Sequence, residues 1–165
     1  FTPAHCLFPR RIYTLVSPAN YGLPVIGRLL PYLGALPVAD TVHGMRALQR
    51  AMETRLGQGC GIVIYPEAHV WEYYTGIRPF PATSFKYPVK LGAPVYAMTV
   101  TYQKARIGKR PRMVVYIDGP FVPTGETAVQ KAESLRAAVR QTMERRSRES
   151  NVEWISYRPK DGDAE

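Results

Sequence analysis

The chain has 165 residues and carries 22 Lys and Arg against 13 Asp and Glu, which gives a formal net charge of +9. A chain of this length buries about two thirds of its unfolded surface, so it needs neither a disulfide framework nor a structural metal to fold. Hydrophobic residues make up 45% of the sequence, which excludes an intrinsically disordered protein. The two cysteines, Cys6 and Cys60, form no CxxC pair and fit a reducing compartment.

The first half of the chain predicts alternating strands and helices. Ile12 to Val16 is a β-branched and aromatic run closed by turn residues, and it predicts a strand. Thr41 to Leu56 has apolar residues at intervals of three and four, which predicts an amphipathic helix. Glycines at 57, 59 and 61 end that helix, and the apolar run Ile62 to Tyr65 predicts a strand covered on both faces. This succession is typical of an α/β domain.

The second half predicts a hairpin and a long helix. Val95 to Thr101 and Met113 to Ile117 read as two strands joined by a connection rich in Lys and Arg. Ala128 to Arg146 carries an apolar stripe at helical spacing and ends in arginines, which suit a helix C-terminus. The predicted fold is therefore α/β, with a mixed, largely parallel sheet flanked by helices. We expect one such domain over residues 1–149, followed by a C-terminal tail over residues 150–165.

The most apolar stretch, Gly22 to Ala39, does not predict a membrane-spanning helix. Arg28 and three prolines interrupt it, whereas a spanning helix needs about 20 mostly apolar residues. Two interpretations remain, in which the segment packs in the core or lies against a bilayer surface. Core packing is favoured, because apolar runs are usually buried in their own domain.

Common catalytic signatures are absent from the sequence. It has neither a G-x-S-x-G elbow nor a G-x-x-x-x-G-K-[ST] loop, which argues against an α/β hydrolase or a P-loop enzyme. A metal site built from Glu67, His69 and Glu72 has no recognised ligand spacing, and we expect none.

The candidate site residues follow the predicted strand Ile62 to Tyr65, because a carboxylate and an imidazole lie two positions apart there. Pro66, Glu67, Ala68 and His69 stand at its carboxyl end, where open α/β sheets usually bind their ligands. The sequence allows two interpretations of this segment. It forms a ligand-binding site, or His69 only packs beneath the next loop.

Three blocks of the sequence resemble the glycerolipid acyltransferases, the 1-acylglycerol-3-phosphate acyltransferase family. Gly22 to Val38 resembles the family's second block, Tyr65-Pro66-Glu67 its third and Ala93-Pro94-Val95 its fourth. The blocks occur in order, with a predicted helix and strand between the second and third. The resemblance implies an acyltransferase-like domain over residues 1–149 that transfers a fatty acyl group from an acyl thioester to a lysophospholipid hydroxyl. Its co-substrate would be acyl-CoA or acyl-carrier protein, with no bound cofactor.

The resemblance also implies a catalytic His followed five positions later by an Asp. The positions five after His5, His43 and His69 hold no carboxylate. In the family this pair lies shortly before the second block, which here would be upstream of Phe1. We therefore expect no catalytic residue within the chain, an N-terminally incomplete domain, and a fragment that is inactive by itself.

The residues after the third block depart from the family pattern. The family usually has Gly-Thr-Arg after Pro-Glu, its arginine binding the acceptor phosphate, but here the residues are Ala68, His69 and Val70. Arg78 or Arg28 is the expected replacement, since arginine grips phosphate through two parallel hydrogen bonds. The resemblance assigns Glu67 to positioning the acceptor, with Pro66, Ala68 and His69 in the pocket wall.

The positive charge has two interpretations. The resemblance implies a peripheral protein on the cytoplasmic face of an anionic membrane. The alternative is a non-catalytic basic module that binds anionic membrane or nucleic acid through phosphate contacts. Nucleic acid is the less favoured partner, because the sequence has no recognised nucleic-acid motif.

Overall fold

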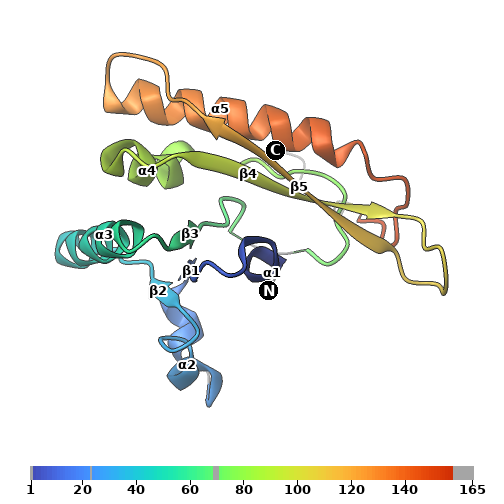
Figure 1. The fold of residues 1–165 in the computed structure, drawn as a ribbon, viewed down its shortest axis with the longest axis horizontal. Helices are drawn as coiled ribbons and strands as arrows, with labels where there is room; N and C mark the ends of the chain where they lie inside the picture. The colour runs from blue at the N-terminus through green and yellow to red at the C-terminus, as the bar shows by residue number, and fades with distance from the viewer. Residues whose placement is uncertain (1, 23, 69–70, 158–165) are drawn as a thin grey trace, which may run out of the picture. The chain divides into compact units, whose positions relative to one another are not determined.

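The structure is a computed structural model that describes residues 2–22, 24–68 and 71–157 (Figure 1). The chain divides into two compact units, Phe1–Pro66 and Glu67–Glu165, called the first and second unit below. Each unit is described by itself.

The first unit is built on a three-stranded parallel sheet. The strands lie in the order β2-β1-β3, and Thr14 of the central β1 pairs with Ala35 on one side and Val63 on the other. Helices occupy the connections between strands, as parallel pairing requires. The elements are α1 (Thr2–Leu7), β1 (Ile12–Val16), η1 (Pro18–Gly22), α2 (Ile26–Leu29), β2 (Ala35–Pro37), α3 (Val42–Gly57) and β3 (Gly61–Val63).

The predicted helix after residue 41 is confirmed as α3. The Thr41 side chain caps it by accepting a hydrogen bond from the Gly44 N–H at 3.2 Å. Leu48 and Met52 on its apolar stripe are buried. The helix stops at the predicted glycines, where Gly59 adopts a φ of +76° that favours glycine. Strand β3 follows but is shorter than predicted, and its residues are only half-buried.

The prediction that Gly22 to Ala39 packs in the core is wrong for its largest side chains. Val25, Leu29, Tyr32 and Leu33 are 50–81% exposed. In the described part of this stretch, the only α-helix and strand are the short elements α2 and β2, so no element there is long enough to bury a continuous apolar face.

The second unit is a hairpin covered by a long helix (Figure 1). Strands β4 and β5 pair antiparallel, with Val100 opposite Val115. The helix α5 packs along β4, and buried residues of both elements form one core with Phe80 and Phe85. The elements are η2 (Ala82–Phe85), α4 (Lys86–Leu91), β4 (Val95–Gln103), β5 (Arg112–Phe121) and α5 (Ala128–Ser147).

The chain directly beyond α5 is hydrogen-bonded to the hairpin. The Asn151 N–H donates to the Tyr102 carbonyl at 3.0 Å, and the Lys104 N–H donates to Asn151 Oδ1 at 2.8 Å. The Gln103 side chain donates to the Glu149 carbonyl at 2.6 Å. These bonds fix the chain beyond α5 alongside the end of β4.

The predicted α/β fold class is confirmed, with a parallel three-stranded sheet and helices. The parallel and antiparallel strand pairs lie in separate sheets. No helix in the described residues is long and apolar enough to cross a membrane.

Candidate functional site

Glu67 and Arg78 form a closed pair at the start of the second unit. The Arg78 backbone N–H donates to Glu67 Oε2 at 2.8 Å, and Arg78 Nη2 donates to the Glu67 carbonyl at 2.6 Å. The guanidinium Nε also lies 3.9 Å from Oε2. The side chain of Arg78 is 19% exposed and that of Glu67 is 23% exposed. Solvent therefore screens the charges of this pair less than it screens those of a surface pair. The pair closes the loop between the two residues.

The loop starts in an unusual backbone conformation. Ala68 has a φ of +63°, in the left-handed region that favours glycine. The resemblance described above places a glycine at this position in the family. Ala68 therefore adopts a turn that fits glycine better, and the Glu67–Arg78 pair helps to hold it there.

An aromatic cluster follows the loop, and it comprises Trp71, Tyr73, Tyr74, Tyr102, Trp154 and Tyr157. Tyr157 stacks on Trp71 with ring centroids 5.0 Å apart, and its hydroxyl donates to the Glu72 carbonyl at 2.8 Å. Tyr73 lies between Tyr102 and Trp154, at 5.3 and 6.3 Å. The cluster joins the loop, strand β4 and the C-terminal segment.

Arg78 links the ion pair to this cluster. Its guanidinium carbon lies 4.8 Å from the centre of the Trp71 ring, a cation–π distance. Within the cluster, burial raises the pKa of Tyr102 above its ordinary value, and the neighbouring Tyr73, Glu72 and Tyr157 raise it further. The Tyr102 phenol is therefore harder to ionise than that of an exposed tyrosine.

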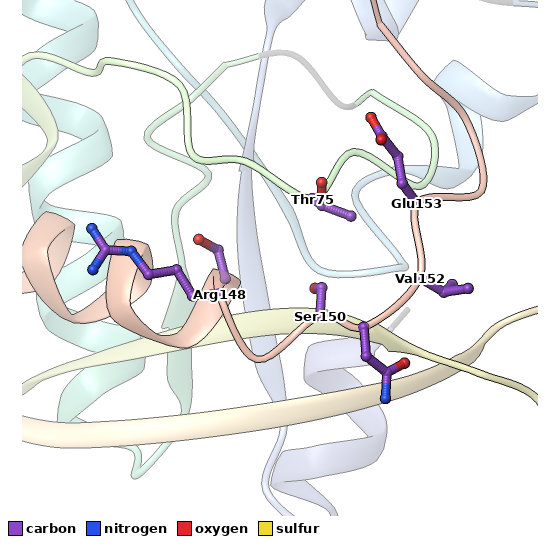
Figure 2. Close-up of a pocket in the computed structure, with 7 residues that line it drawn as sticks. Thr75, Arg148, Ser150, Val152 and Glu153 are labelled. Carbon is purple, nitrogen blue, oxygen red and sulfur yellow. The ribbon is translucent and has the colours of Figure 1, made fainter.

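A cavity of about 390 Å³ opens beside the cluster, between the loop and the end of α5. Figure 2 shows Thr75 and Glu153 on one side and Ser150 on the other, with Arg148 at the end of the helix. Six of the seven residues that line it have polar side chains, and the lining comprises Thr75, Ser147, Arg148, Ser150, Asn151, Val152 and Glu153. The cavity offers hydroxyl, amide and charged groups to a ligand.

One solved structure matches the chain. It is the 1-acyl-sn-glycerophosphate (LPA) acyltransferase PlsC from Thermotoga maritima, with a TM-score of 0.57 and 20% sequence identity. The fold is glycerolipid acyltransferase-like. The match covers 87% of this chain and 58% of that protein, so the chain spans less than two thirds of the enzyme's length. No protein-family model and no curated protein matches the sequence.

The structure brings two of the predicted site residues of this acyltransferase-like fold together, Glu67 and Arg78. Pro66 ends the first unit and Ala68 is exposed. Arg28 is exposed on α2 and belongs to the first unit, whereas Glu67 belongs to the second. His69 lies outside the described residues.

The sequence did not predict the lining of the cavity. Residues 150–157, which belong to the predicted tail over residues 150–165, supply one of the two aromatic contacts that Trp71 makes among the described residues and four of the seven residues that line the cavity. Trp154 and Tyr157 were the available signal, because large aromatic side chains seldom occur in unpacked tails. Within residues 2–22, 24–68 and 71–157, no group of three or more His, Cys, Asp and Glu could hold a metal ion.

Proposed function

We propose that the protein transfers a fatty acyl group from an acyl thioester to the free hydroxyl of a lysophospholipid, as a step of phospholipid synthesis. The observation that carries this proposal is the fold likeness to an LPA acyltransferase over 87% of the chain. The sequence blocks support it independently, because Tyr65-Pro66-Glu67 stands between the second and fourth blocks in the order of the family.

The reaction requires a base for the acceptor hydroxyl. The hydroxyl oxygen attacks the thioester carbonyl, a C–O bond forms, and the C–S bond breaks. The proton of the hydroxyl passes to the base and from there to the leaving thiolate. A histidine held in the correct tautomer by a carboxylate performs this role. We propose that this pair is supplied by residues upstream of Phe1, because no His of the chain has a carboxylate in the required register.

In this proposal Glu67 and Arg78 position the acceptor. The carboxylate of Glu67 is occupied by the Arg78 backbone N–H, which fixes the loop, and the guanidinium sits beside that carboxylate and over Trp71. A cation held in this way suits an acidic headgroup through charge-assisted hydrogen bonds. We place the protein on the cytoplasmic face of the membrane, with acyl-CoA or acyl-carrier protein as donor.

The decisive experiment uses the protein with its natural upstream residues. We expect it to transfer a labelled acyl group from acyl-CoA or acyl-carrier protein to lysophosphatidic acid in mixed micelles. Substitution of the upstream His by Ala should abolish transfer, and the 165-residue chain should be inactive. If no His with an Asp five positions later precedes Phe1, or if the longer protein transfers no acyl group, the proposal is wrong.

The headgroup assignment is tested by Arg78→Ala in the longer protein. We expect KM to rise about 10- to 100-fold for lysophosphatidic acid, the range of a lost hydrogen bond to a charged group, and far less for a neutral 1-acylglycerol. Damage to the loop affects both acceptors, so the ratio of the two KM values isolates the headgroup contact.

Arg28→Ala serves as the matched control, because Arg28 is the other candidate cation. An unchanged KM ratio in Arg78→Ala contradicts the role of Arg78. A changed KM ratio in Arg28→Ala alone would assign the contact with the headgroup to Arg28.

A further inference from the structure

The connection between β4 and β5 carries a dense group of cations, and we call residues 104–112 the hairpin tip. Its five basic residues all have exposed side chains: Lys104, Arg106, Lys109, Arg110 and Arg112. The sequence has no Asp or Glu between Gln103 and Ile117. The hairpin tip extends away from α4 and from the body of α5 in the second unit (Figure 1). It is a projecting, strongly positive surface.

These cations have no acidic partners within the described residues. The ion pairs there belong to Arg78 and to arginines of α5, and none involves the hairpin tip. Helix α5 thus neutralises part of its own charge, whereas the hairpin tip presents its whole charge to solvent. Such a field attracts an anionic surface.

An aliphatic side chain stands among the cations. Ile107 is 96% exposed, the highest value among the large hydrophobic residues of the described chain, and Met113 at the base of β5 is 58% exposed. Nucleic-acid phosphates give no apolar contact to an isoleucine between basic residues. A bilayer does, because its interface accepts an apolar side chain while Lys and Arg extend along it to the lipid phosphates.

We propose that the hairpin tip docks the protein on an anionic lipid bilayer. Ile107 enters the boundary between headgroups and acyl chains, and the surrounding basic residues contact the lipid phosphates. This inference concerns a surface remote from Glu67 in the sequence and does not depend on acyl transfer, so the two proposals fail separately.

The test compares two double variants of the 165-residue chain with equal net charge. Arg106→Gln/Arg110→Gln removes two charges from the hairpin tip. Lys86→Gln/Lys90→Gln removes two exposed charges from α4, at the other end of a nine-residue strand about 30 Å long. Binding is measured by flotation with vesicles of phosphatidylglycerol and phosphatidylcholine, and with phosphatidylcholine alone.

Each basic residue near an anionic surface strengthens binding about fivefold, so we expect the hairpin variant to bind anionic vesicles about 25-fold more weakly. The affinity of the α4 variant should change less than about threefold. Neither variant should alter the thermal unfolding of the chain. Equal losses in the two variants, or equal binding to neutral and anionic vesicles, would overturn the proposal.

Ile107→Ser tests the apolar contact separately. We expect about tenfold weaker vesicle binding with an unchanged dependence on NaCl concentration, because no charge is lost. A duplex DNA gel shift at the same salt distinguishes the nucleic-acid alternative. Tight duplex binding that depends on Arg106 and Arg110 but not on Ile107, without vesicle binding, would assign the hairpin tip to nucleic acid instead.

Discussion

Ala68 has a backbone conformation that is unfavourable for a residue with a side chain. Its φ of +63° costs a side chain with a Cβ about 1–2 kcal/mol relative to glycine. The sequence identifies this position as a departure from the glycine that the resemblance implies, but it does not predict that Ala68 adopts a left-handed conformation. Glu67, the residue just before Ala68, is held by two hydrogen bonds with Arg78.

We predict that Ala68→Gly stabilises the chain by about 0.5–1 kcal/mol. Glycine relieves the strain of the left-handed conformation, but its greater freedom in the unfolded state cancels part of that gain. Ala137→Gly, at an exposed interior position of α5, should instead destabilise it by about 1 kcal/mol. Urea unfolding measures both. A loss of stability in Ala68→Gly would contradict the strained turn.

Asp118 is the second residue whose chemistry depends on one partner. Arg146 Nη2 and Nε donate to its two carboxylate oxygens at 2.7 and 3.0 Å. This hydrogen bonding, with the charges of Arg146 and Arg145, lowers the pKa of Asp118 below its ordinary value although partial burial opposes the shift. The pair joins α5 to β5.

The pKa of this carboxyl group is lower in the folded chain than its value of about 3.9 in the unfolded chain, so the ionised group stabilises the fold at pH values above about 3.9. This stabilisation is lost as the pH falls through the pKa of the folded chain. We predict that Asp118→Asn lowers the melting temperature by about 3–6 °C at pH 7. The difference from the parent chain should shrink below about pH 4. Glu53→Gln, at an exposed carboxylate of α3, should change the melting temperature little. A difference that persists unchanged at pH 2.5 would contradict this role.

Among the helices and strands, the sequence predicts best those whose bounds are set by local residue patterns. Strand β1 was predicted with its observed bounds, because a β-branched run meets turn residues at its end. Helices α3 and α5 followed from their apolar spacing. Strand β2 was missed, because Ala35, Leu36 and Pro37 carry no β-branched residue and pair only through the neighbouring β1.

Helix α5 begins with a capping box. Thr127 Oγ1 accepts from the Gln130 N–H at 3.2 Å, and Gln130 Oε1 accepts in return from the Thr127 N–H at 3.1 Å. We predict that Thr127→Ala destabilises the chain by about 1 kcal/mol. Thr124→Ala, an exposed position before the helix, should cost less than about 0.5 kcal/mol in the same unfolding experiment. Equal effects would show that the cap contributes nothing.

At the scale of the whole molecule, the second unit depends on contacts between distant parts of the chain. Phe80 and Phe85 pack with residues of β4 and α5, which lie far along the sequence. Leu135 is 1% exposed at the centre of this core. The apolar spacing over Ala128 to Arg146 predicts a stripe that includes Leu135, but it does not predict which elements cover that stripe.

We predict that Leu135→Ala destabilises the chain by about 2–5 kcal/mol, through lost apolar burial and the cavity that remains. Val129→Ala, at a position of the same helix that is 63% exposed, should change stability by less than about 0.5 kcal/mol. Denaturant unfolding followed by circular dichroism compares the two. A loss below about 1 kcal/mol in Leu135→Ala would show that the core has relaxed around the missing side chain.

The stacking of Tyr157 on Trp71 has a consequence for the order in which the molecule is completed. Synthesis on the ribosome delivers Glu67, Arg78 and Trp71 long before Tyr157. Domains fold as their residues emerge, and contacts with a late partner must wait for it. The loop behind Glu67 therefore acquires its final aromatic support only when nearly all of these 165 residues have been translated.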